Sequence, residues 1–394
     1  MNMKYKRLGE LCNIVSGGTP SRSKTEYWNE GTIPWIKIGN IKGKYINEAD
    51  EFITQMGLDK SSAKLLTKGT VLYSIFATLG EVGILGIDAC TNQAIAGITI
   101  KDVSSIDADY LYYYLKSKKS YVNNVGRGVA QNNINLSMLR EFEVPLLELH
   151  KQKEIVTILD MVLNIIVARK EELKKLDELI KARFVEMFGD ARKNPNKYDT
   201  VSFIDIVEYM GDIGSNGANK VVVDHLDMKD KEDYAMMVRF TNFTKNDFTD
   251  DVKYVSKEAY DFFKKSQIFG GELIICKIGS AGQNYVMPYL NRPVSLGLNQ
   301  IMVRIKDNIL MPYLYQYLHT DYGEFLISGC INGAVTKTIT KTELKKIPVM
   351  LPPMELQEQF ADFVHQVDKS KVAIQAALDK SQLLFDSLMQ KYFG

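Results

Sequence analysis

An apolar heptad pattern that occurs twice, 205 residues apart, constrains the fold of this chain most. Within each copy, apolar residues recur at alternating steps of three and four over nearly five heptads. This spacing predicts a long helix with a coiled-coil seam in each copy. The predicted seam consists of Ile155, Leu159, Val162, Ile166, Leu173, Leu176 and Ile180 in the first copy, and of Phe360, Val364, Val367, Ile374, Leu378, Phe385 and Leu388 in the second.

The sequence before each predicted helix is also repeated. Residues 128–144 align with residues 333–349 at the same separation of 205. Further upstream we aligned three shorter matches, which pair Tyr110-Leu111-Tyr112 with Tyr313-Leu314-Tyr315, Asn92-Gln93 with Asn299-Gln300, and Gly80 and Gly83 with Gly279 and Gly282. These upstream matches drift from the separation of 205, as insertions in loops would cause. Similar segments in the same order at a nearly constant separation indicate an internal repeat. The chain is therefore predicted to be one unit of about 200 residues written twice.

The segments between the predicted helices mix short strand patterns with short helix patterns, which predicts an α+β fold. We divide the 394 residues into a globular domain, a long helix, a second globular domain and a second long helix, with bounds of 1–147, 148–189, 190–352 and 353–394. Two similar copies favour a closed pseudo-two-fold arrangement, in which the two helices pair as an antiparallel coiled coil.

Composition limits the chain's location and partners. Lys and Arg number 49 against 48 Asp and Glu, and residues 1–147 hold 17 basic and 14 acidic side chains. Since non-specific DNA binding depends on neutralising phosphates, the chain alone should hold DNA weakly. It carries no apolar run that could span a membrane, no signal peptide and four scattered cysteines, so we expect a cytoplasmic protein with reduced thiols.

Motifs for four catalytic classes are missing or incomplete. The Pro352-Pro353 pair lacks the flanking residues of an amino-methyltransferase motif, and no phosphate-binding loop is complete. The four histidines are isolated, which argues against a zinc site. A metal nuclease would cut DNA with magnesium without help, and Glu343-Leu344-Lys345 alone does not support that alternative. We expect a chain without catalytic residues or a metal.

An ordered set of short motifs resembles the specificity subunit of type I restriction–modification enzymes over the full chain. The set includes the loop at residues 16–21, the strand at 33–38, the segment at 347–357 that opens the second helix, and the endings Met187-Phe188-Gly189 and Tyr392-Phe393-Gly394. The second globular domain departs from the first by having Gly214-Ser215-Asn216-Gly217 in place of the first loop. We therefore expect this loop to differ in geometry between the two domains but to keep the same role.

The resemblance implies two target-recognition domains, each binding one half of a bipartite sequence in double-stranded DNA. The helices would set the spacer and dock two modification subunits, which bring S-adenosylmethionine and methylate adenine. Restriction subunits that use ATP and magnesium would join them, and this chain would carry no cofactor. Two alternatives stay open: the specificity component of a related system in which nuclease and methyltransferase are fused, and a coiled-coil scaffold that does not bind DNA.

Candidate DNA-binding residues come from comparing the two repeats. Features present in both should serve the fold or contact the DNA backbone, whereas polar loop residues that differ should bind different base sequences. The candidates in the first domain are Ser21, Arg22, Lys24, Lys37, Asn40, Lys42, Arg127, Gln131 and Asn132. Those in the second are Asn216, Asn219, Lys220, Arg239, Asn242, Lys277, Asn284, Thr336 and Lys337.

Overall fold

A computed structural model describes residues 4–126 and 133–394 of the chain. The chain forms two compact units: unit 1 comprises residues 1–170 and 375–394, and unit 2 comprises residues 171–374. The two long helices are α6 (Leu149–Phe188) and α13 (Met354–Phe393), and each unit contains a segment of both. The boundaries of the compact units thus fall inside the two long helices.

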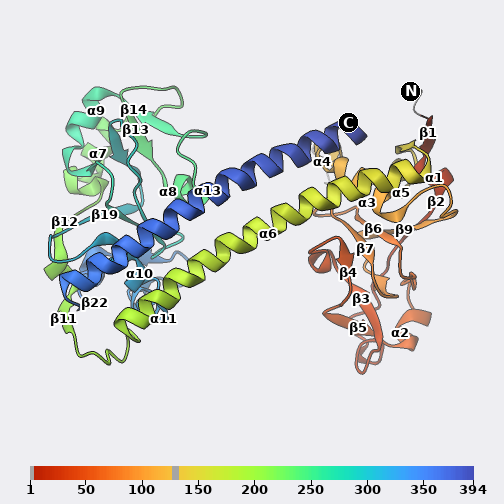
Figure 1. Ribbon diagram of the computed structural model, residues 1–394, viewed down its shortest axis with the longest axis horizontal. Helices are drawn as coiled ribbons and strands as arrows, with labels where there is room; N and C mark the ends of the chain where they lie inside the picture. The colour runs from red at the N-terminus through yellow and green to blue at the C-terminus, as the bar shows by residue number, and fades with distance from the viewer. Residues whose placement is uncertain (1–3, 127–132) are drawn as a thin grey trace. The chain divides into compact units, whose positions relative to one another are not determined.

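Unit 1 is built around a five-stranded sheet in the order β2 (Cys12–Ser16), β9 (Ile95–Ile100), β6 (Val71–Ser74), β7 (Val82–Leu85) and β4 (Tyr45–Ile46). A three-stranded sheet follows the order β5 (Glu51–Ile53), β3 (Ile33–Ile36) and β8 (Cys90–Thr91). Figure 1 shows α3 (Ala108–Ser117) next to the start of α6, whereas β3 and β5 lie at the end of the unit far from that helix.

Unit 2 repeats this plan with two four-stranded sheets. The first follows the order β12 (Val207–Gly211), β19 (Gln300–Ile305), β16 (Leu273–Cys276) and β17 (Asn284–Val286). The second follows the order β14 (Lys253–Val255), β13 (Ala235–Val238), β18 (Val294–Leu296) and β15 (Gln267–Ile268). The mixture of helices and strands confirms the predicted α+β class.

Short elements complete each unit. An antiparallel strand pair lies just before each long helix: β1 (Lys4–Arg7) with β10 (Glu143–Leu146), and β11 (Asp199–Ser202) with β22 (Pro348–Leu351). The remaining strands are β20 (Ile331–Asn332) and β21 (Thr338–Ile339). The remaining helices are α1 (Leu8–Leu11), η1 (Thr25–Tyr27), η2 (Ile38–Asn40), α2 (Gln55–Asp59), α4 (Lys119–Gly126), α5 (Leu136–Arg140), η3 (Phe203–Ile206), η4 (Ile213–Asn216), α7 (Asn219–His225), α8 (Phe240–Lys245), α9 (Lys257–Phe262), η5 (Lys264–Ser266), α10 (Met311–Leu318), α11 (Asp321–Gly329) and α12 (Lys341–Leu344).

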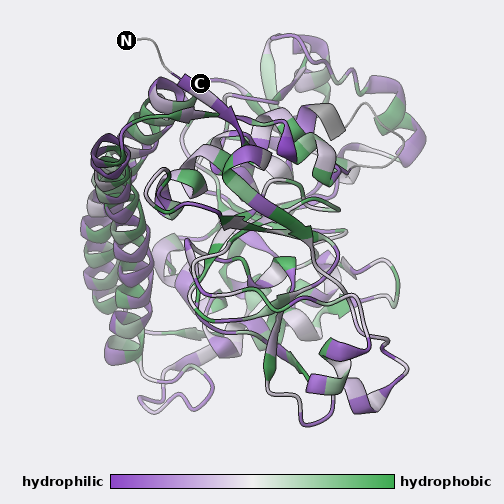
Figure 2. Cartoon of the chain, turned by 90° about the vertical axis from the view of Figure 1, so that its right-hand side faces the viewer, coloured by the Kyte–Doolittle hydropathy of each residue, from purple (hydrophilic) through white to green (hydrophobic). Residues whose placement is uncertain are grey.

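The predicted seam residues of the long helices lie on their buried sides. None of the fourteen is exposed, and Leu159 and Phe360 are fully buried. Figure 2 shows hydrophobic residues interrupting the otherwise hydrophilic surface of both helices. In unit 2 the two helices run antiparallel, because Asp177 pairs with Lys371 at 2.6 Å and the Phe184 ring lies 5.5 Å from that of Phe360.

A buried glutamine anchors each long helix to its globular part. In unit 1 the Gln152 side chain accepts a hydrogen bond from the Asp107 backbone N–H and donates to the carbonyl oxygens of Ser105 and Leu147. In unit 2 Gln357 accepts from the Leu310 N–H and donates to the carbonyls of Asn308 and Pro352. Both glutamines are fully buried, so these bonds satisfy backbone groups that water cannot reach.

Strand pairing corrects part of the predicted repeat register. Val71 and Leu273 begin equivalent strands, and each hairpin closes with a glycine N–H, from Gly80 to the Ser74 carbonyl and from Gly282 to the Cys276 carbonyl. The predicted pairing of Gly80 with Gly279 is therefore wrong. Gly80 is equivalent to Gly282, and Gly279 is equivalent to Ala77.

The Asn-Gln match is also wrong, by two residues. The Asn92 N–H bonds to the Ile36 carbonyl as the Gly297 N–H bonds to the Val238 carbonyl, so Asn92 is equivalent to Gly297. The two Asn-Gln pairs are identical in sequence, but they occupy different positions relative to the equivalent strands.

Candidate nucleic-acid interface

A basic residue followed three positions later by asparagine occurs at equivalent places in the two units. Lys37 follows β3 and Arg239 follows β13, and each is the N-cap residue of the next short helix. The Lys37 N–H donates to Asn40 Oδ1 at 2.9 Å, and the Arg239 N–H donates to Asn242 Oδ1 at 2.9 Å. The same turn therefore places a basic side chain beyond the end of the equivalent strand in each unit.

An acidic residue from a neighbouring segment holds each of these basic side chains. The Lys37 ammonium pairs with the carboxylate of Glu51, and the Arg239 guanidinium lies 3.1 Å from Asp251 Oδ1. The side-chain amide groups of the two asparagines also donate hydrogen bonds within their own units. Asn242 is only 2% exposed and donates to the Asp247 carbonyl, while Asn40 donates to Asp50 at 2.8 Å.

In unit 1, aromatic and acidic side chains surround the guanidinium of Arg22. Its guanidinium lies 3.6 Å above the Trp28 ring centroid and 5.0 Å from that of Trp35, and it forms an ion pair with Glu51 at 2.5 Å. Glu51 thus brings two predicted residues, Arg22 and Lys37, to one place. A guanidinium stacked on an indole and paired with a carboxylate is held in a fixed orientation, with half of its side chain exposed.

The other described candidates of unit 1 lie close to this cluster in sequence. Lys24 donates from its ammonium to the Tyr27 hydroxyl at 3.1 Å, and the Ser21 hydroxyl lies 2.9 Å from that of Ser23. Lys42 is exposed in the turn after η2. Arg127, Gln131 and Asn132 lie outside the described residues.

Unit 2 places a different charged cluster at the ends of β12 and β16. The carboxylate of Asp212 accepts from the Lys277 ammonium at 2.8 Å, from the Lys341 ammonium at 2.9 Å and from the Ser215 hydroxyl at 3.0 Å. Burial raises the pKa of Asp212, but the hydrogen bonds from these three side chains outweigh burial and lower the pKa to about 2. Asp212 is therefore ionised in the folded protein at neutral pH.

The remaining candidates of unit 2 differ in accessibility. Asn216 bonds to Ser266 and to two backbone groups, and Asn284 is only 6% exposed, so both amides are placed to support loops. Asn219 and Lys220 are exposed in the first turn of α7. Thr336 and Lys337 are exposed in the loop before β21, whose Lys337 carbonyl accepts from the Gly279 N–H.

Three residues that hold these clusters together were not predicted from the sequence: Glu51, Asp212 and Lys341. Asp212 lies 65 positions from Lys277 and 129 from Lys341, so no local pattern joins them. A signal did exist for the turn shared by the two units. The basic residue of Lys37-Ile38-Gly39-Asn40 and of Arg239-Phe240-Thr241-Asn242 recurs at the same distance from asparagine.

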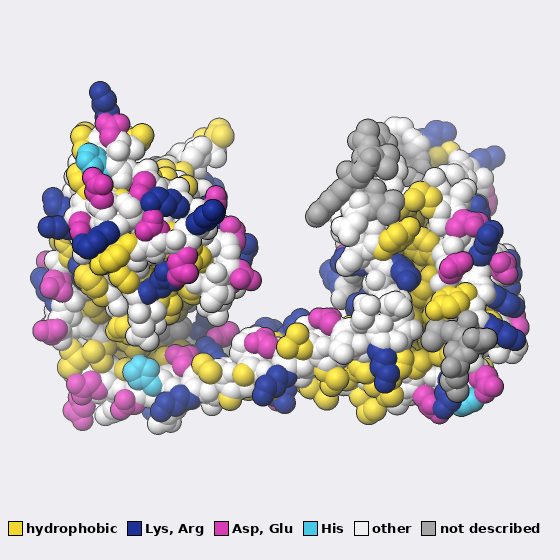
Figure 3. All heavy atoms as spheres, turned by 90° about the horizontal axis from the view of Figure 1, so that it is seen from above, with side chains coloured by type: hydrophobic (Ala, Val, Ile, Leu, Met, Phe, Trp, Pro, Cys, Tyr) yellow, Lys and Arg dark blue, Asp and Glu magenta, His cyan; other side chains and the backbone are white. Residues whose placement is uncertain are grey.

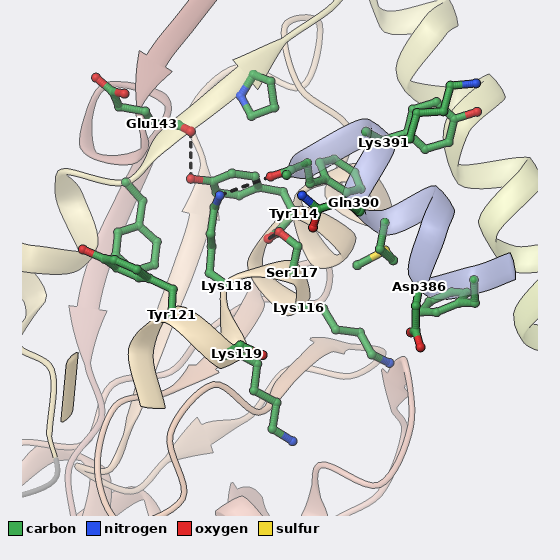
Figure 4. A pocket seen from close by; sticks show the side chains of 18 of the residues that line it. Tyr114, Lys116, Ser117, Lys118, Lys119, Tyr121, Glu143, Asp386, Gln390 and Lys391 are labelled. Atoms are coloured by element: carbon green, nitrogen blue, oxygen red, sulfur yellow. Dashed lines mark hydrogen bonds between the residues drawn. The ribbon is translucent and has the colours of Figure 1, made fainter. Parts of the chain in front are cut away.

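A recess of unit 1 lies beside the end of α13 and has a volume of about 930 Å³. Figure 4 shows Lys116, Lys118 and Lys119 around it, with Lys118 donating to the Phe393 carbonyl and Tyr114 to that of Glu143. Burial lowers the pKa of Lys118. In unit 2 the equivalent Phe188 end of α6 continues into a linker, where Ala191 is buried and the Asn196 amide bonds to the Phe188 carbonyl.

Charges on the described surface are mixed in sign. Figure 3 shows Lys and Arg interspersed with Asp and Glu on the face of each unit that it draws. Within residues 4–126 and 133–394, no group of three or more His, Cys, Asp or Glu side chains is arranged to hold a metal ion. No helix in the described part of the chain combines the length and apolar character needed to cross a membrane.

The curated proteins to which the chain is similar are specificity subunits of type I restriction enzymes. The chain is 30% identical over 188 residues to the specificity subunit of the type I restriction enzyme MjaIX of Methanocaldococcus jannaschii, covering 46% of this chain and 42% of that protein. It is 26% identical over 206 residues to the EcoR124I/EcoR124II specificity subunit of Escherichia coli, covering 51% and 50%. The chain thus spans about half the length of the curated relatives that it matches.

The fold is also found in a solved structure. The S subunit of a type I restriction–modification system from M. genitalium superposes with a TM-score of 0.54 at 16% identity, covering 100% of this chain and 97% of that one. The family described as type I restriction modification DNA specificity domain matches residues 1–177 and again residues 205–382. Because these two matches cover most of the 394 residues, the chain belongs to the type I restriction–modification DNA specificity family and carries two copies of its domain.

Proposed function

We propose that the chain is the DNA-specificity subunit of a type I restriction–modification complex, with each unit binding one half of a bipartite duplex sequence. The observation that carries this proposal is the pair of family matches, each of which falls largely within one of the two compact units. The turn shared by the two units supports it, because Lys37 and Arg239 provide a cation at equivalent places. Phosphate contacts are independent of sequence, so two related domains can share them.

The unit-specific clusters support different sequences for the two half-sites. Arg22 with Trp28 and Glu51 has no equivalent in unit 2, where Met237 and Lys253 take the strand positions of Trp35 and Glu51. The Asp212 cluster has no charged equivalent in unit 1. Base edges differ from pair to pair in the major groove, so polar groups that differ between the domains fit different bases.

Apolar residues on the outer sides of the long helices support docking of two methyltransferase subunits. On the unit 1 segments, Met161 is 55% exposed and Leu383 is 70% exposed, and Ile165, Val167 and Leu384 are also exposed. These side chains lie outside the buried seam. Neighbouring exposed apolar side chains, such as Met161 and Ile165 one helical turn apart on α6, are typical of a surface that another protein covers.

The proposal assigns chemistry to partner subunits. S-adenosylmethionine, ATP and magnesium would bind to methyltransferase and restriction subunits, and this chain would choose the sequence without catalysing a reaction. The incomplete catalytic motifs of the sequence support this division.

Selection from a pool of randomised duplex DNA tests the proposal. The full chain, at low ionic strength, should enrich two short sequences separated by a spacer of constant length. Enrichment of no sequence, or of a single uninterrupted one, would contradict the proposal. Incubation of the same chain with magnesium and plasmid DNA should give no cleavage, and cutting would contradict the absence of catalysis.

A further inference from the structure

Two lysines of unit 2 share one buried carboxylate. The Asp212 side chain is 8% exposed, and each of its oxygens accepts from a different ammonium group: Oδ2 from Lys277 and Oδ1 from Lys341. The lysines themselves are 37% and 33% exposed. Two cations and one anion leave a net charge of +1 at a partly open site.

The carboxylate fixes where the two ammonium groups point. Lys341 also donates to the Ser215 hydroxyl at 3.0 Å, which in turn donates to Asp212 at 3.0 Å. An ammonium group has three N–H donors. Within the described part of the chain, these contacts use one donor of Lys277 and two of Lys341. The cluster therefore retains N–H donors for a ligand, while the buried carboxylate already accepts hydrogen bonds at both oxygens.

Strand pairing shows that unit 1 has no such cluster. Ile275 pairs with Ile301 as Tyr73 pairs with Ala96, so Lys277 takes the place of Ile75. Thr340 caps α12 as Asn135 caps α5, so Lys341 takes the place of Leu136. Gly211 pairs with Met302 as Val15 pairs with Gly97, which gives Asp212 the place of Ser16. All three charges belong to unit 2 alone.

We propose that Lys277 and Lys341, positioned by Asp212, contact a guanine in the half-site that unit 2 binds and determine the identity of that base. The inference rests on the proposed function, because it requires that unit 2 bind duplex DNA. Guanine presents two acceptors, O6 and N7, in the major groove, and lysine donors suit both. Adenine and cytosine present amino groups there, which need an acceptor, and the Asp212 carboxylate is 8% exposed and already accepts from three side chains. Thymine presents a single acceptor, O4, beside a methyl group, so only guanine offers one acceptor to each lysine.

A phosphate is the other acceptor that two lysines could bind. Phosphate contacts carry no base information, so they suit the basic residue that the two units share, which is Arg239 in unit 2. Arg239 therefore provides the matched control. Its replacement should weaken binding to all sequences alike, whereas replacement of Lys341 should change the preference for one base.

The experiment selects duplex DNA from a randomised pool with the full chain and sequences the bound fraction. Relative to the wild-type chain, Lys277→Ala and Lys341→Ala should each reduce the preference for guanine at one position of one half-site by about ten-fold. Asp212→Asn should affect the same position, because it releases both lysines. Preferences in the other half-site should stay unchanged. Preferences at the remaining positions of the half-site that unit 2 binds should also persist, which shows that unit 2 of the variants is folded.

Two results would overturn the inference. One is an unchanged base preference in both lysine variants, which would make the cluster a structural ion pair. The other is an equal loss of affinity for all sequences with a shallower salt dependence, as for Arg239→Ala, which would make it a phosphate site. If the wild-type chain itself enriches no sequence, the proposed function fails first, and the variants are not needed to detect that failure.

Discussion

Residues whose side chains hold other side chains in place are the hardest to predict from local sequence. Glu51 in unit 1 and Asp212 in unit 2 each receive two cations, and each joins segments that are distant in the chain. Arg22, Lys37 and Lys277 were identifiable as candidates from the sequence because they are basic and lie in loops. Their acidic partners were not, because only the tertiary fold brings them together.

Arg22→Ala should alter the base preference at one position of a single half-site. The guanidinium is oriented by Trp28 and Glu51, and a bidentate arginine contact typically contributes about 1–3 kcal/mol of discrimination. Selection from randomised duplex DNA measures this change, and the second half-site is the internal control. Equal loss of preference in both half-sites would show that the two units do not act independently.

Asp212→Asn should lower the free energy of unfolding at neutral pH by about 2 kcal/mol. The folded pKa of about 2 lies below the ordinary value of 3.8, so the ionised form stabilises the fold above pH 4. That stabilisation disappears as the pH falls from about 4 to about 2, and the difference between variant and wild type should shrink with it. Urea unfolding at several pH values measures the effect.

The exposed pair Lys257–Asp261 offers a control for this titration. The Asp261 side chain is 50% exposed, and exposed ion pairs contribute little to stability. Asp261→Asn should therefore leave the free energy of unfolding nearly unchanged at every pH. A loss equal to that of Asp212→Asn would indicate a general charge effect.

At the scale of elements, each long helix depends on the glutamine near its start. Gln152→Leu would leave one backbone N–H and two carbonyls of unit 1 buried without partners, at a cost of about 2–4 kcal/mol. Urea unfolding of Gln152→Leu should show this loss, and Gln357→Leu should show a similar one. Gln359 is exposed on α13, and Gln359→Leu should cause little change.

The seam of the helices is the element that the sequence predicted best. Heptad spacing depends only on the regular geometry of a helix, so the apolar side could be identified without the tertiary fold. The spacing did not identify Phe184 and Phe188, fully buried aromatic residues that pack on Tyr313. Those contacts depend on α10, which lies more than 120 residues away in sequence.

A charge in the seam should disrupt the helix packing. Leu378 is 8% exposed within unit 1, and Leu378→Asp would bury an unpaired carboxylate at a cost of several kcal/mol. Thermal unfolding should show a clear loss of stability, and complex formation with a methyltransferase subunit should be impaired. Ala376 is exposed on the same helix, so Ala376→Asp is the matched control. Normal stability of Leu378→Asp would contradict the role of the seam.

At the scale of the whole molecule, balanced charge predicts dependence on a partner for affinity. The chain has 49 basic and 48 acidic residues, so it can neutralise few phosphates alone. Fluorescence anisotropy with labelled duplex DNA should give weak binding with a shallow salt dependence. A methyltransferase subunit should strengthen binding and steepen that dependence by about 0.9 for each added phosphate contact. Strong, steeply salt-dependent binding by the chain alone would contradict this expectation.

The repeat was predictable as a whole but not in its details. Tyr110 and Tyr313 are equivalent as predicted, since each hydroxyl bonds to the carbonyl of the strand before its long helix. The Asn92-Gln93 match failed because loops of different length separate the strands. Sequence similarity of two residues cannot distinguish equivalent positions from neighbouring ones when insertions lie between them.

The register shift between Val207 and Tyr209 has an evolutionary consequence. In unit 1 the edge strand β2 pairs with β9 without interruption, whereas β12 gains one residue relative to its partner β19. That single insertion moves Asp212, rather than Gly211, into the place of Ser16. An edge strand can therefore accept a one-codon insertion that changes which side chain follows the strand, while the pairing with the neighbouring strand persists. Duplicated domains of this kind can diverge in target sequence by length changes as well as by substitutions.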